Sequence, residues 1–396
     1  MRFSGFDEDW VSYKIGDISK TYSGGTPSTS KREYYKGNIP FIKSGEIGNE
    51  VTEQYINEEA INNSSAKKVQ KGDLLLALYG ATSGEVAISK IDGAINQAVL
   101  KIDNKMNNYF QYNYFVKYKD QIIHKYLQGG QGNLSANIIK KLEFYYPNLE
   151  EQQKISNYLL LIDNKIELLE KKHNEYQNFK KYLMQQIFAQ KLRFNFTDEW
   201  EKYLLGDISL IGKGFTPSTS NPSFWDGDLK WLSIADMNQG KYINQTTKKI
   251  TSDGSKNKEP VKKSTLLMSF KLSIGKLGIL TEDMYTNEAI CNFKWKNKDV
   301  LTEYMYYYLS SINILKYGSQ AAKGITLNNE TLSTIPVLLP SLEEQKKIIN
   351  ILSDVDMKIN MLENSINDTS KFKKGLLQQM FVVQLILSLL QNKKHI

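Results

Sequence analysis

The stretch PNLEEQQKISNYLLLIDNKIELLEKKHNEYQNFKKYLMQQIF, residues 147–188, occurs a second time at residues 340–381 as PSLEEQKKIINILSDVDMKINMLENSINDTSKFKKGLLQQMF. The two copies align without a gap, and roughly half of the paired positions are identical. A repeat of fixed period is typical of a repeated architecture, so it has to be explained before any single motif.

Each copy begins with a helix-start signal. Asn148 stands three residues before Glu151, and Ser341 stands three residues before Glu344. This spacing predicts a capping box, in which the cap side chain and the glutamate side chain each bind a backbone N–H group that would otherwise lack a partner.

Both copies also carry one apolar stripe. Its residues recur at steps of four and three, which is the spacing of a coiled-coil seam. Each helix needs a partner for its stripe, and the other copy offers a matching one. The predicted seam residues are Ile155, Leu159, Ile162, Ile166 and Leu169 in the first copy and Ile348, Leu352, Val355, Ile359 and Leu362 in the second.

The repeat extends beyond the helices. Thr-Pro-Ser-Thr-Ser at residues 26–30 returns unchanged at residues 216–220, and Asn-Gln-Ala at 96–98 matches Asn-Glu-Ala at 287–289. The order is therefore domain, helix, domain, helix. We place a first domain at residues 1–146, a central helix at 147–194, a second domain at 195–339, and a second helix with a tail at 340–396.

Within each domain the patterns are short and mostly β-like. Apolar runs at residues 74–78 and 266–270 are bounded by polar and glycine residues and predict strands. Longer aromatic-rich stretches at 109–126 and 301–317 predict one helix in each domain. The most divergent parts, residues 50–70 and 240–262, are polar and are expected to be loops.

Helix length predicts how the parts connect. A helix of about 40 residues is about 60 Å long, and the repeat starts again at Arg193-Phe194 as it did at Arg2-Phe3. A parallel helix pair would need a long return connection, which the chain lacks. We expect an α+β protein with two similar mixed α/β domains, separated by two long antiparallel coiled-coil helices and related by a pseudo-twofold axis.

Composition limits the class of protein. The 396 residues are 41% hydrophobic and 24% charged, as in a globular chain of two or more domains. A single cysteine, Cys291, suits a reducing cytoplasm. The N-terminus has no signal-peptide pattern, and the apolar run at residues 381–390 is too short for a bilayer. The net charge of +8 is spread evenly along the chain and supports DNA binding only weakly.

The GGTPST segment at residues 24–29, its echo at 214–219, and the two helices that open with P-x-L-E-E-Q together resemble a type I restriction-modification specificity subunit. The resemblance covers nearly the whole chain. It implies two target recognition domains, each followed by a spacer helix. It also implies a subunit that is not catalytic and that binds double-stranded DNA, two methyltransferase subunits and, through the complex, restriction subunits. S-adenosylmethionine, ATP and Mg are expected in those partner subunits, and no cofactor or metal in this chain.

The residue pattern agrees with a subunit that is not catalytic. The three histidines and one cysteine show no zinc-type or Cys/His spacing, and no phosphate-binding loop of the G-x-x-x-x-G-K-[ST] type is present. His173 falls on the helix seam. Asp226, Asp228 and Lys230 could form part of a nuclease site, but metal-assisted cleavage needs more carboxylates than this stretch offers.

Polar loop residues are the candidates for DNA contact. The Thr-Pro-Ser-Thr-Ser loops could hold phosphates, or a serine in each could simply cap a short helix, and both interpretations stay open. The glycine-rich loops near residues 129–133 and 322–324 carry side chains that could reach base edges. The candidates are Ser28, Thr29, Ser30, Lys31, Arg32, Lys43, Tyr79, Gln97, Gln131, Asn133, Ser218, Thr219, Ser220, Lys271, Ser273 and Lys323.

Two other classes of function also fit the pattern. One is a stand-alone enzyme that acts on DNA, and the other is a tandem-domain scaffold that binds proteins through its helices. Salt-sensitive binding to duplex DNA separates a DNA reader from a scaffold, because phosphate contacts release counterions.

Overall fold

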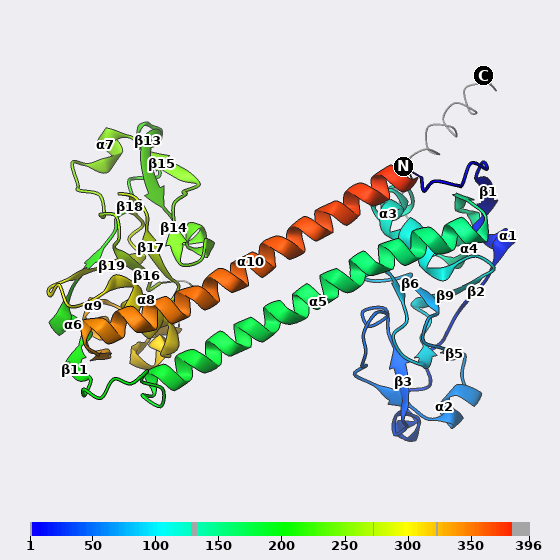
Figure 1. Cartoon of the computed structure of the whole chain (residues 1–396), viewed down its shortest axis with the longest axis horizontal. Coiled ribbons are helices and arrows are strands. Elements are labelled where there is room, and N and C mark those ends of the chain that lie inside the picture. Colours follow the sequence, from blue (N-terminus) through cyan, green and yellow to red (C-terminus); the bar gives the residue numbers. More distant parts are fainter. Residues whose placement is uncertain (1, 128–132, 272, 322–323, 382–396) are drawn as a thin grey trace. The chain divides into compact units, whose positions relative to one another are not determined.

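The computed structural model describes residues 2–127, 133–271, 273–321 and 324–381. Gln131, Lys323 and the apolar tail lie outside these ranges. The chain divides into two compact units, residues 1–171 with 363–396, and residues 172–362. Each unit contains one domain and parts of both long helices (Figure 1). The boundaries placed at residues 146, 194 and 339 therefore stay a prediction.

The domain of the first unit is built on two four-stranded sheets. One sheet has the order β2-β9-β6-β7, the other has the order β4-β3-β8-β5, and a separate pair joins β1 to β10. The strands are β1 (Val11–Lys14), β2 (Ser19–Ser23), β3 (Ile39–Ile42), β4 (Tyr55–Ile56), β5 (Lys67–Val69), β6 (Leu74–Ala77), β7 (Val86–Ile88), β8 (Gly93–Ile95), β9 (Val99–Asn104) and β10 (Glu143–Tyr146). The helices are α1 (Ile15–Ile18), η1 (Arg32–Tyr35), α2 (Glu58–Asn62), α3 (Asn108–Leu127) and α4 (Ala136–Lys141).

The domain of the second unit repeats this plan with variations. Its sheets have the orders β12-β19-β16-β17-β14 and β15-β13-β18, with the pairs β11-β22 and β20-β21. The strands are β11 (Glu201–Leu204), β12 (Ser209–Lys213), β13 (Trp225–Leu232), β14 (Tyr242–Ile243), β15 (Lys248–Ile250), β16 (Leu266–Ser269), β17 (Leu277–Leu280), β18 (Tyr285–Thr286), β19 (Ile290–Trp295), β20 (Ser319–Ala321), β21 (Gly324–Thr326) and β22 (Pro336–Leu339). The helices are α6 (Leu205–Ile208), η2 (Pro222–Phe224), η3 (Ala235–Asn238), α7 (Ser252–Ser255), α8 (Thr302–Ser311), η4 (Ile314–Tyr317) and α9 (Asn329–Ser333).

The secondary-structure predictions are largely confirmed inside the domains. The two predicted apolar strands are β6 and β16, whose residues are all buried. The two aromatic stretches form α3 and α8, although α8 ends at Ser311 and a short 3-10 helix follows it. The prediction of plain loops at 50–70 and 240–262 is wrong. These segments contain α2, α7 and four short strands, which pair with strands distant in sequence.

Two helices of 40 residues each, α5 (Leu149–Phe188) and α10 (Leu342–Phe381), take part in both units. In the first unit the start of α5, at Ile155 and Leu159, shares one apolar core with the end of α10 at Phe381. In the second unit the end of α5, at Ile187, shares a core with the start of α10 at Ile348. The helices are therefore antiparallel in each unit, as predicted (Figure 1).

The predicted seam residues pack against the domains as well as against the opposite helix. Ile155, Leu159 and Ile162 are buried in the same core as the rings of Phe110 and Tyr114 on α3. In the second unit Ile348, Leu352 and Val355 are buried in the core that contains α8. Toward the middle of the helices Ile166, Leu169 and Ile359 are only partly buried, whereas Leu362 is buried. Each domain thus covers much of the apolar stripe on the helix that follows it.

Ion pairs join the two helices at equivalent positions of the repeat. Asp163 on α5 binds Lys373 on α10 at 2.6 Å in the first unit. In the second unit Asp356 on α10 binds Lys180 on α5, also at 2.6 Å. Asp356 occupies in the second copy the place of Asp163 in the first, and Lys373 occupies the place of Lys180. Each unit therefore makes the same contact with the roles of the helices exchanged.

The capping prediction is half right. The side chain of Asn148 accepts the backbone N–H of Glu151 at 2.9 Å, and that of Ser341 accepts the N–H of Glu344 at 3.4 Å. The glutamate half is wrong, because both carboxylates are buried and bound by an arginine instead. Arg2 donates to both oxygens of Glu151 at 2.9 and 2.7 Å. Such a charge-assisted, two-point contact is stronger than a neutral cap.

The second copy repeats the arginine contact. Arg193 donates to both oxygens of Glu344 at 2.8 and 2.9 Å, and Trp200 Nε1 donates to the same carboxylate at 3.0 Å. The side chain of Glu344 is 1% exposed. Side-chain hydrogen bonding to Glu344 raises the pKa of Arg193. The Arg-Phe echo before each domain therefore ties the chain to the start of the helix that follows that domain.

Replacing Arg193 is expected to destabilise the chain strongly. In Arg193→Met the buried carboxylate of Glu344 keeps Trp200 but loses its charged partner, a change that costs about 3–5 kcal/mol at a buried ion pair. Urea unfolding followed by tryptophan fluorescence should show a clearly lower midpoint. Lys202→Met, at an exposed lysine of the same unit, should change stability by less than about 0.5 kcal/mol. Equal midpoints for the two variants would contradict a stabilising role for this contact.

Candidate nucleic-acid interface

In the first unit, loops distant in sequence meet at one edge of a sheet. Strands β3 and β8 run parallel, with Ile42 opposite Ile95, so the chain leaves both strands on the same side. Lys43 follows one strand, and Gln97 follows the other by two residues. The Thr-Pro-Ser-Thr-Ser loop joins them, because Thr26 Oγ1 donates to Gln97 Oε1 at 2.6 Å.

Glycine is required where this loop crosses the sheet. The N–H of Gly24 donates to the carbonyl of Asn96 at 3.2 Å. A Cβ on Gly24 would lie 1.8 Å from the carbonyl oxygen of Ile95, closer than any side chain allows. In the second unit a Cβ on Gly214 would lie 2.0 Å from the carbonyl oxygen of Thr286. The glycine at the start of each repeated segment therefore lets the loop lie directly on the strand end.

Two more candidates lie at the same edge of the first unit. The N–H of Leu78 donates to Ala98 at 2.8 Å, and the N–H of Leu134 donates to Leu78 at 3.1 Å. Tyr79 and Asn133 stand next to these residues and are exposed. We call this group the first loop edge. It consists of Ser28, Thr29, Ser30, Lys31, Arg32, Lys43, Tyr79, Gln97 and Asn133.

The second unit has an equivalent edge. The N–H of Phe215 donates to Thr286, that of Asn287 to Leu232, and that of Phe270 to Ala289, at 2.8 to 3.0 Å. These bonds gather the loops that follow β12, β13, β16 and β18. We call the group the second loop edge. It consists of Ser218, Thr219, Ser220, Ser233, Lys271, Ser273 and Glu288, of which Ser233 is half-buried and the others are exposed.

The serine hydroxyls of the repeated loops are not helix caps. Ser28 and Ser30 share a hydrogen bond of 2.8 Å, and so do Ser218 and Ser220. The 3-10 helix after the first loop has no side-chain cap, and the one after the second loop is capped by Asn221. The capping interpretation is therefore wrong. Contact of these exposed hydroxyls with phosphates stays a prediction.

The positively charged side chains of the first loop edge differ in their contacts and exposure. Lys31 Nζ donates to the Tyr34 hydroxyl at 2.9 Å, and this hydrogen bond raises the pKa of Lys31. Lys43 is half-buried, 3.9 Å from Glu53. Arg32 is exposed beside them.

An open hollow lies at the first loop edge. It is lined by Gly24, Gly25, Thr26, Ser28, Asn63, Ser64, Ser65 and Gln97. Its lining consists of glycine, hydroxyl and amide groups, which suit hydrogen bonding to a polar ligand.

Aromatic side chains donate hydrogen bonds to the backbone of both repeated loops. Tyr34 is 2% exposed and belongs to the core. The Tyr35 hydroxyl donates to the carbonyl of Pro27 at 2.7 Å, and Trp225 Nε1 donates to the carbonyl of Ser218 at 3.1 Å. These two hydrogen bonds therefore help to hold the loops in place.

The two edges differ at an equivalent position of which the predicted candidates included only the first-unit residue. Gln97 in the first unit corresponds to Glu288 in the second, and each accepts a hydrogen bond from the matching threonine, Thr26 or Thr216. Gln97 is left with an amide donor, whereas Glu288 is left with carboxylate acceptors only. The match of residues 96–98 with 287–289 was the available signal for Glu288.

The residues that suggested catalysis do not assemble into a site. Lys230 Nζ lies 2.5 Å from Glu282 and donates to the carbonyl of Asn244 at 2.8 Å, and Asp228 is exposed. Burial raises the pKa of the Cys291 thiol to about 12, and His173 is half-buried on α5. Within the described ranges, no three His, Cys, Asp or Glu side chains are grouped as metal ligands would be.

None of the helices in the described part of the chain has the length and apolar character that crossing a membrane requires.

The sequence matches the model of the type I restriction modification DNA specificity domain twice, at residues 7–178 and 197–369. This chain belongs to that family. Each match contains one loop edge and most of the long helix that follows it, so the family repeat and the structural repeat coincide. The two matches together span most of this chain.

This chain is similar over most of its length to known specificity subunits. The type I restriction enzyme MjaVIII specificity subunit of Methanocaldococcus jannaschii is 26% identical over 402 aligned residues, which cover 93% of this chain and 91% of that one. The EcoBI specificity subunit of Escherichia coli is 20% identical, with 91% and 82% covered. Among solved structures, the type I restriction-modification S subunit of M. genitalium has a TM-score of 0.63 at 14% identity, with 96% and 97% covered. That structure shares the fold.

Proposed function

We propose that this chain is the DNA-specificity subunit of a type I restriction-modification complex and that it reads an asymmetric site in two parts. The observation that carries the proposal is the duplicated loop edge within a duplicated specificity domain. Each edge presents exposed hydroxyl and charged groups, and the first edge also presents amides, which is the chemistry that contacts phosphates and base edges. The edges differ in residues such as Gln97 and Glu288, so the two half-sites should differ in sequence.

The two helices supply a spacer in this proposal. Antiparallel pairing, repeated in both units, would relate the domains by an approximate twofold axis and invert the half-sites. Domains that contact major-groove segments about one helical turn apart, about 34–36 Å, leave the base pairs between them unread. We propose α5 and α10 as the elements that set this distance.

Catalysis belongs to partner subunits in this proposal. The chain would bind double-stranded DNA together with two methyltransferase subunits, one for each half of the repeat, and restriction subunits would join through that complex. S-adenosylmethionine would be held by the methyltransferase, and ATP and Mg by the partners that use them.

Mapping of methylated positions tests the proposal. The chain is expressed with its methyltransferase partner, and methylated bases are located across the host genome by single-molecule sequencing. We expect two defined sequences separated by a fixed number of unread base pairs. A continuous motif, or methylation that does not depend on this chain, would contradict the proposal. Failure to show salt-sensitive binding to duplex DNA would favour a protein scaffold instead.

Glu288→Gln should change the second half-site and leave the first unchanged. A carboxylate accepts a hydrogen bond from cytosine N4, whereas a glutamine pairs with adenine N6 and N7, and each such contact discriminates by about 1–3 kcal/mol. The reciprocal variant, Gln97→Glu, should act on the first half-site only. Both changes are nearly isosteric, so each variant should keep the fold of the wild type. Identical methylation motifs for the wild type and both variants would show that this position does not read DNA.

A further inference from the structure

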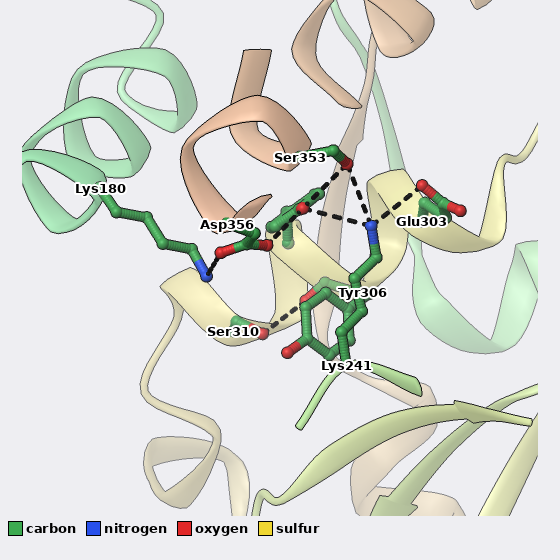
Figure 2. Close-up of polar contacts among 8 residues, drawn as sticks. Lys180, Lys241, Glu303, Tyr306, Ser310, Ser353 and Asp356 are labelled. Carbon is green, nitrogen blue, oxygen red and sulfur yellow. Dashed lines mark hydrogen bonds and ion pairs between the residues drawn. The ribbon is translucent and has the colours of Figure 1, made fainter. Parts of the chain in front are cut away.

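Lys241 lies at the centre of a polar cluster in the second unit, just before β14 (Figure 2). Its side chain is only 10% exposed. Its ammonium group contacts Glu303 Oε2 at 3.0 Å, the Tyr307 hydroxyl at 3.2 Å and Ser353 Oγ at 3.2 Å. Glu303 and Tyr307 belong to α8, and Ser353 belongs to α10. One cation thus joins a loop of the domain to two helices.

The surroundings stabilise this charge. The Lys241 ammonium lies 4.6 Å from the centre of the Tyr307 ring and 5.1 Å from that of Tyr242, within the range of cation–π attraction. Partial burial works to raise the pKa of the Glu303 carboxyl, but hydrogen bonds from Tyr242 and Lys241 hold it below its ordinary value. A charged Lys241–Glu303 pair is therefore the favoured state.

The cluster continues to the other long helix. The Tyr307 hydroxyl donates to Asp356 Oδ2 at 2.6 Å, and Asp356 Oδ1 binds Lys180 of α5 at 2.6 Å (Figure 2). A chain of contacts thus leads from Lys241 through α8 and α10 to α5. The charges form two ion pairs, Lys241–Glu303 and Asp356–Lys180, so each partly buried charge has a partner.

Lys241 is also connected to the second loop edge. Ser233 belongs to that edge, and its N–H and hydroxyl both donate to Asp236, at 2.9 and 2.7 Å. Three residues on, the Gln239 side chain accepts the N–H groups of Asn244 and Gln245. The carbonyl of Lys241 accepts the N–H of Ile279 at 2.8 Å, next to the parallel pair of β14 and β17. The segment from the loop edge to Lys241 is thus held by several hydrogen bonds.

We propose that Lys241 is a positioning residue that fixes the second loop edge relative to α10, and thereby sets where the second half-site must lie. The inference rests on the proposed function. Lys241 does not contact DNA in this account. It acts through the held segment that ends at Ser233.

The first unit makes the corresponding connection differently. Lys90 binds Glu167 of α5 at 2.8 Å and Glu50, in the loop after Lys43, at 3.4 Å. Their side chains are 41%, 60% and 72% exposed, and exposed ion pairs of this kind contribute little. Lys90 therefore offers a comparison, because it also joins a loop of its domain to a long helix, but through exposed side chains.

Lys241→Met in the full chain, assembled with its methyltransferase partner, tests the proposal. Synthetic duplexes carry the native site with its own spacer, or with a spacer one base pair longer or shorter. We expect the preference for the native spacer to fall at least about tenfold, because displacements of about 1 Å can cost about 100-fold in a reaction that depends on alignment. The sequence of the first half-site should be unchanged, and Lys90→Met should leave the spacer preference near that of the wild type.

A second variant keeps the test decisive if the methionine variant folds poorly. Lys241→Met combined with Glu303→Gln removes the uncompensated carboxylate and should regain stability without regaining the spacer preference. If this folded double variant selects the native spacer as strictly as the wild type, the positioning role is overturned, although a two-part motif would still support the proposed function. If the wild type itself shows no two-part motif, the proposed function fails first.

Discussion

A fragment of residues 1–194 is expected to form a symmetric homodimer that directs methylation to a palindrome built from the first half-site. In the full chain the domain of the first unit covers its core with Leu376, Leu377, Met380 and Phe381 from the end of α10. The fragment lacks these residues, but the end of α5 carries Leu183, Met184, Ile187 and Phe188 at the equivalent positions. A second copy of the fragment can therefore fill the same places.

The aromatic contacts support this exchange. The Phe381 ring packs on Tyr114 with a centroid distance of 4.6 Å, and in the second unit the Phe188 ring packs on the equivalent Tyr308 at 5.5 Å. The ion pairs are also interchangeable, since Asp163 of one copy would meet Lys180 of the other twice. A twofold dimer buries both apolar stripes in one isologous interface.

Light scattering at micromolar concentration measures the first step, and methylation mapping with the methyltransferase partner measures the second. A fragment that stays monomeric, or a dimer that still prefers the asymmetric site, would contradict the equivalence of the two halves.

Charge reversal gives the fragment a sharper control. Asp163→Lys alone places lysines opposite each other in the homodimer, and Lys180→Asp alone places aspartates opposite each other. Each reversal should weaken its homodimer by about 2 kcal/mol, or about thirtyfold in dissociation constant. A mixture of the two variants restores both attractive pairs and should form the heterodimer. Equal association of all combinations would show that these charges do not guide the pairing.

In the full chain, Asp163→Lys together with Asp356→Lys is expected to loosen the spacer while leaving the domains folded. Both aspartates bind a lysine of the other helix, and they also accept hydrogen bonds from Tyr109 and Tyr307. The lysines are 24% and 12% exposed and the aspartates 22% and 26%, so the combined loss should be about 3 kcal/mol.

The expected readouts are a lower thermal midpoint and methylation at sites with altered spacer lengths. Adding Lys180→Asp and Lys373→Asp to the same chain exchanges the charges and should recover both properties. Spacing that is unaffected by the double reversal would show that the helix pair does not set the distance between half-sites.

The sequence predicted the elements whose signals are local. The apolar stripe from Ile155 to Ile162 indicated α5, the run at 74–78 indicated β6, and the asparagine at 148 indicated the helix start. Each of these depends on side chains within one or two turns, or on alternation within one strand. The gap-free repeat between the two halves also indicated the antiparallel helix pair, because one continuous chain with no long return connection allows little else.

Longer-range pairings could not be predicted in this way. Glu151 fits a capping box by spacing, yet it binds Arg2, which is 149 residues away in sequence. The polar segment at 240–262 looked like a loop, because strands of two or three residues carry almost no periodic signal and form only against a distant partner.

By itself the sequence determined the duplication, the two long helices, the principal strands and the family. Only the tertiary structure decided which residues act together: the loops gathered at each edge, the difference between Gln97 and Glu288, and the contacts of Lys241. The physical reason is the distance along the sequence over which the deciding interactions act. Helix periodicity and capping are properties of neighbouring residues, whereas a loop edge exists only when parallel strands such as β3 and β8 end on the same side of a sheet, and a buried lysine is stable only where separate elements bring a carboxylate and aromatic rings to it.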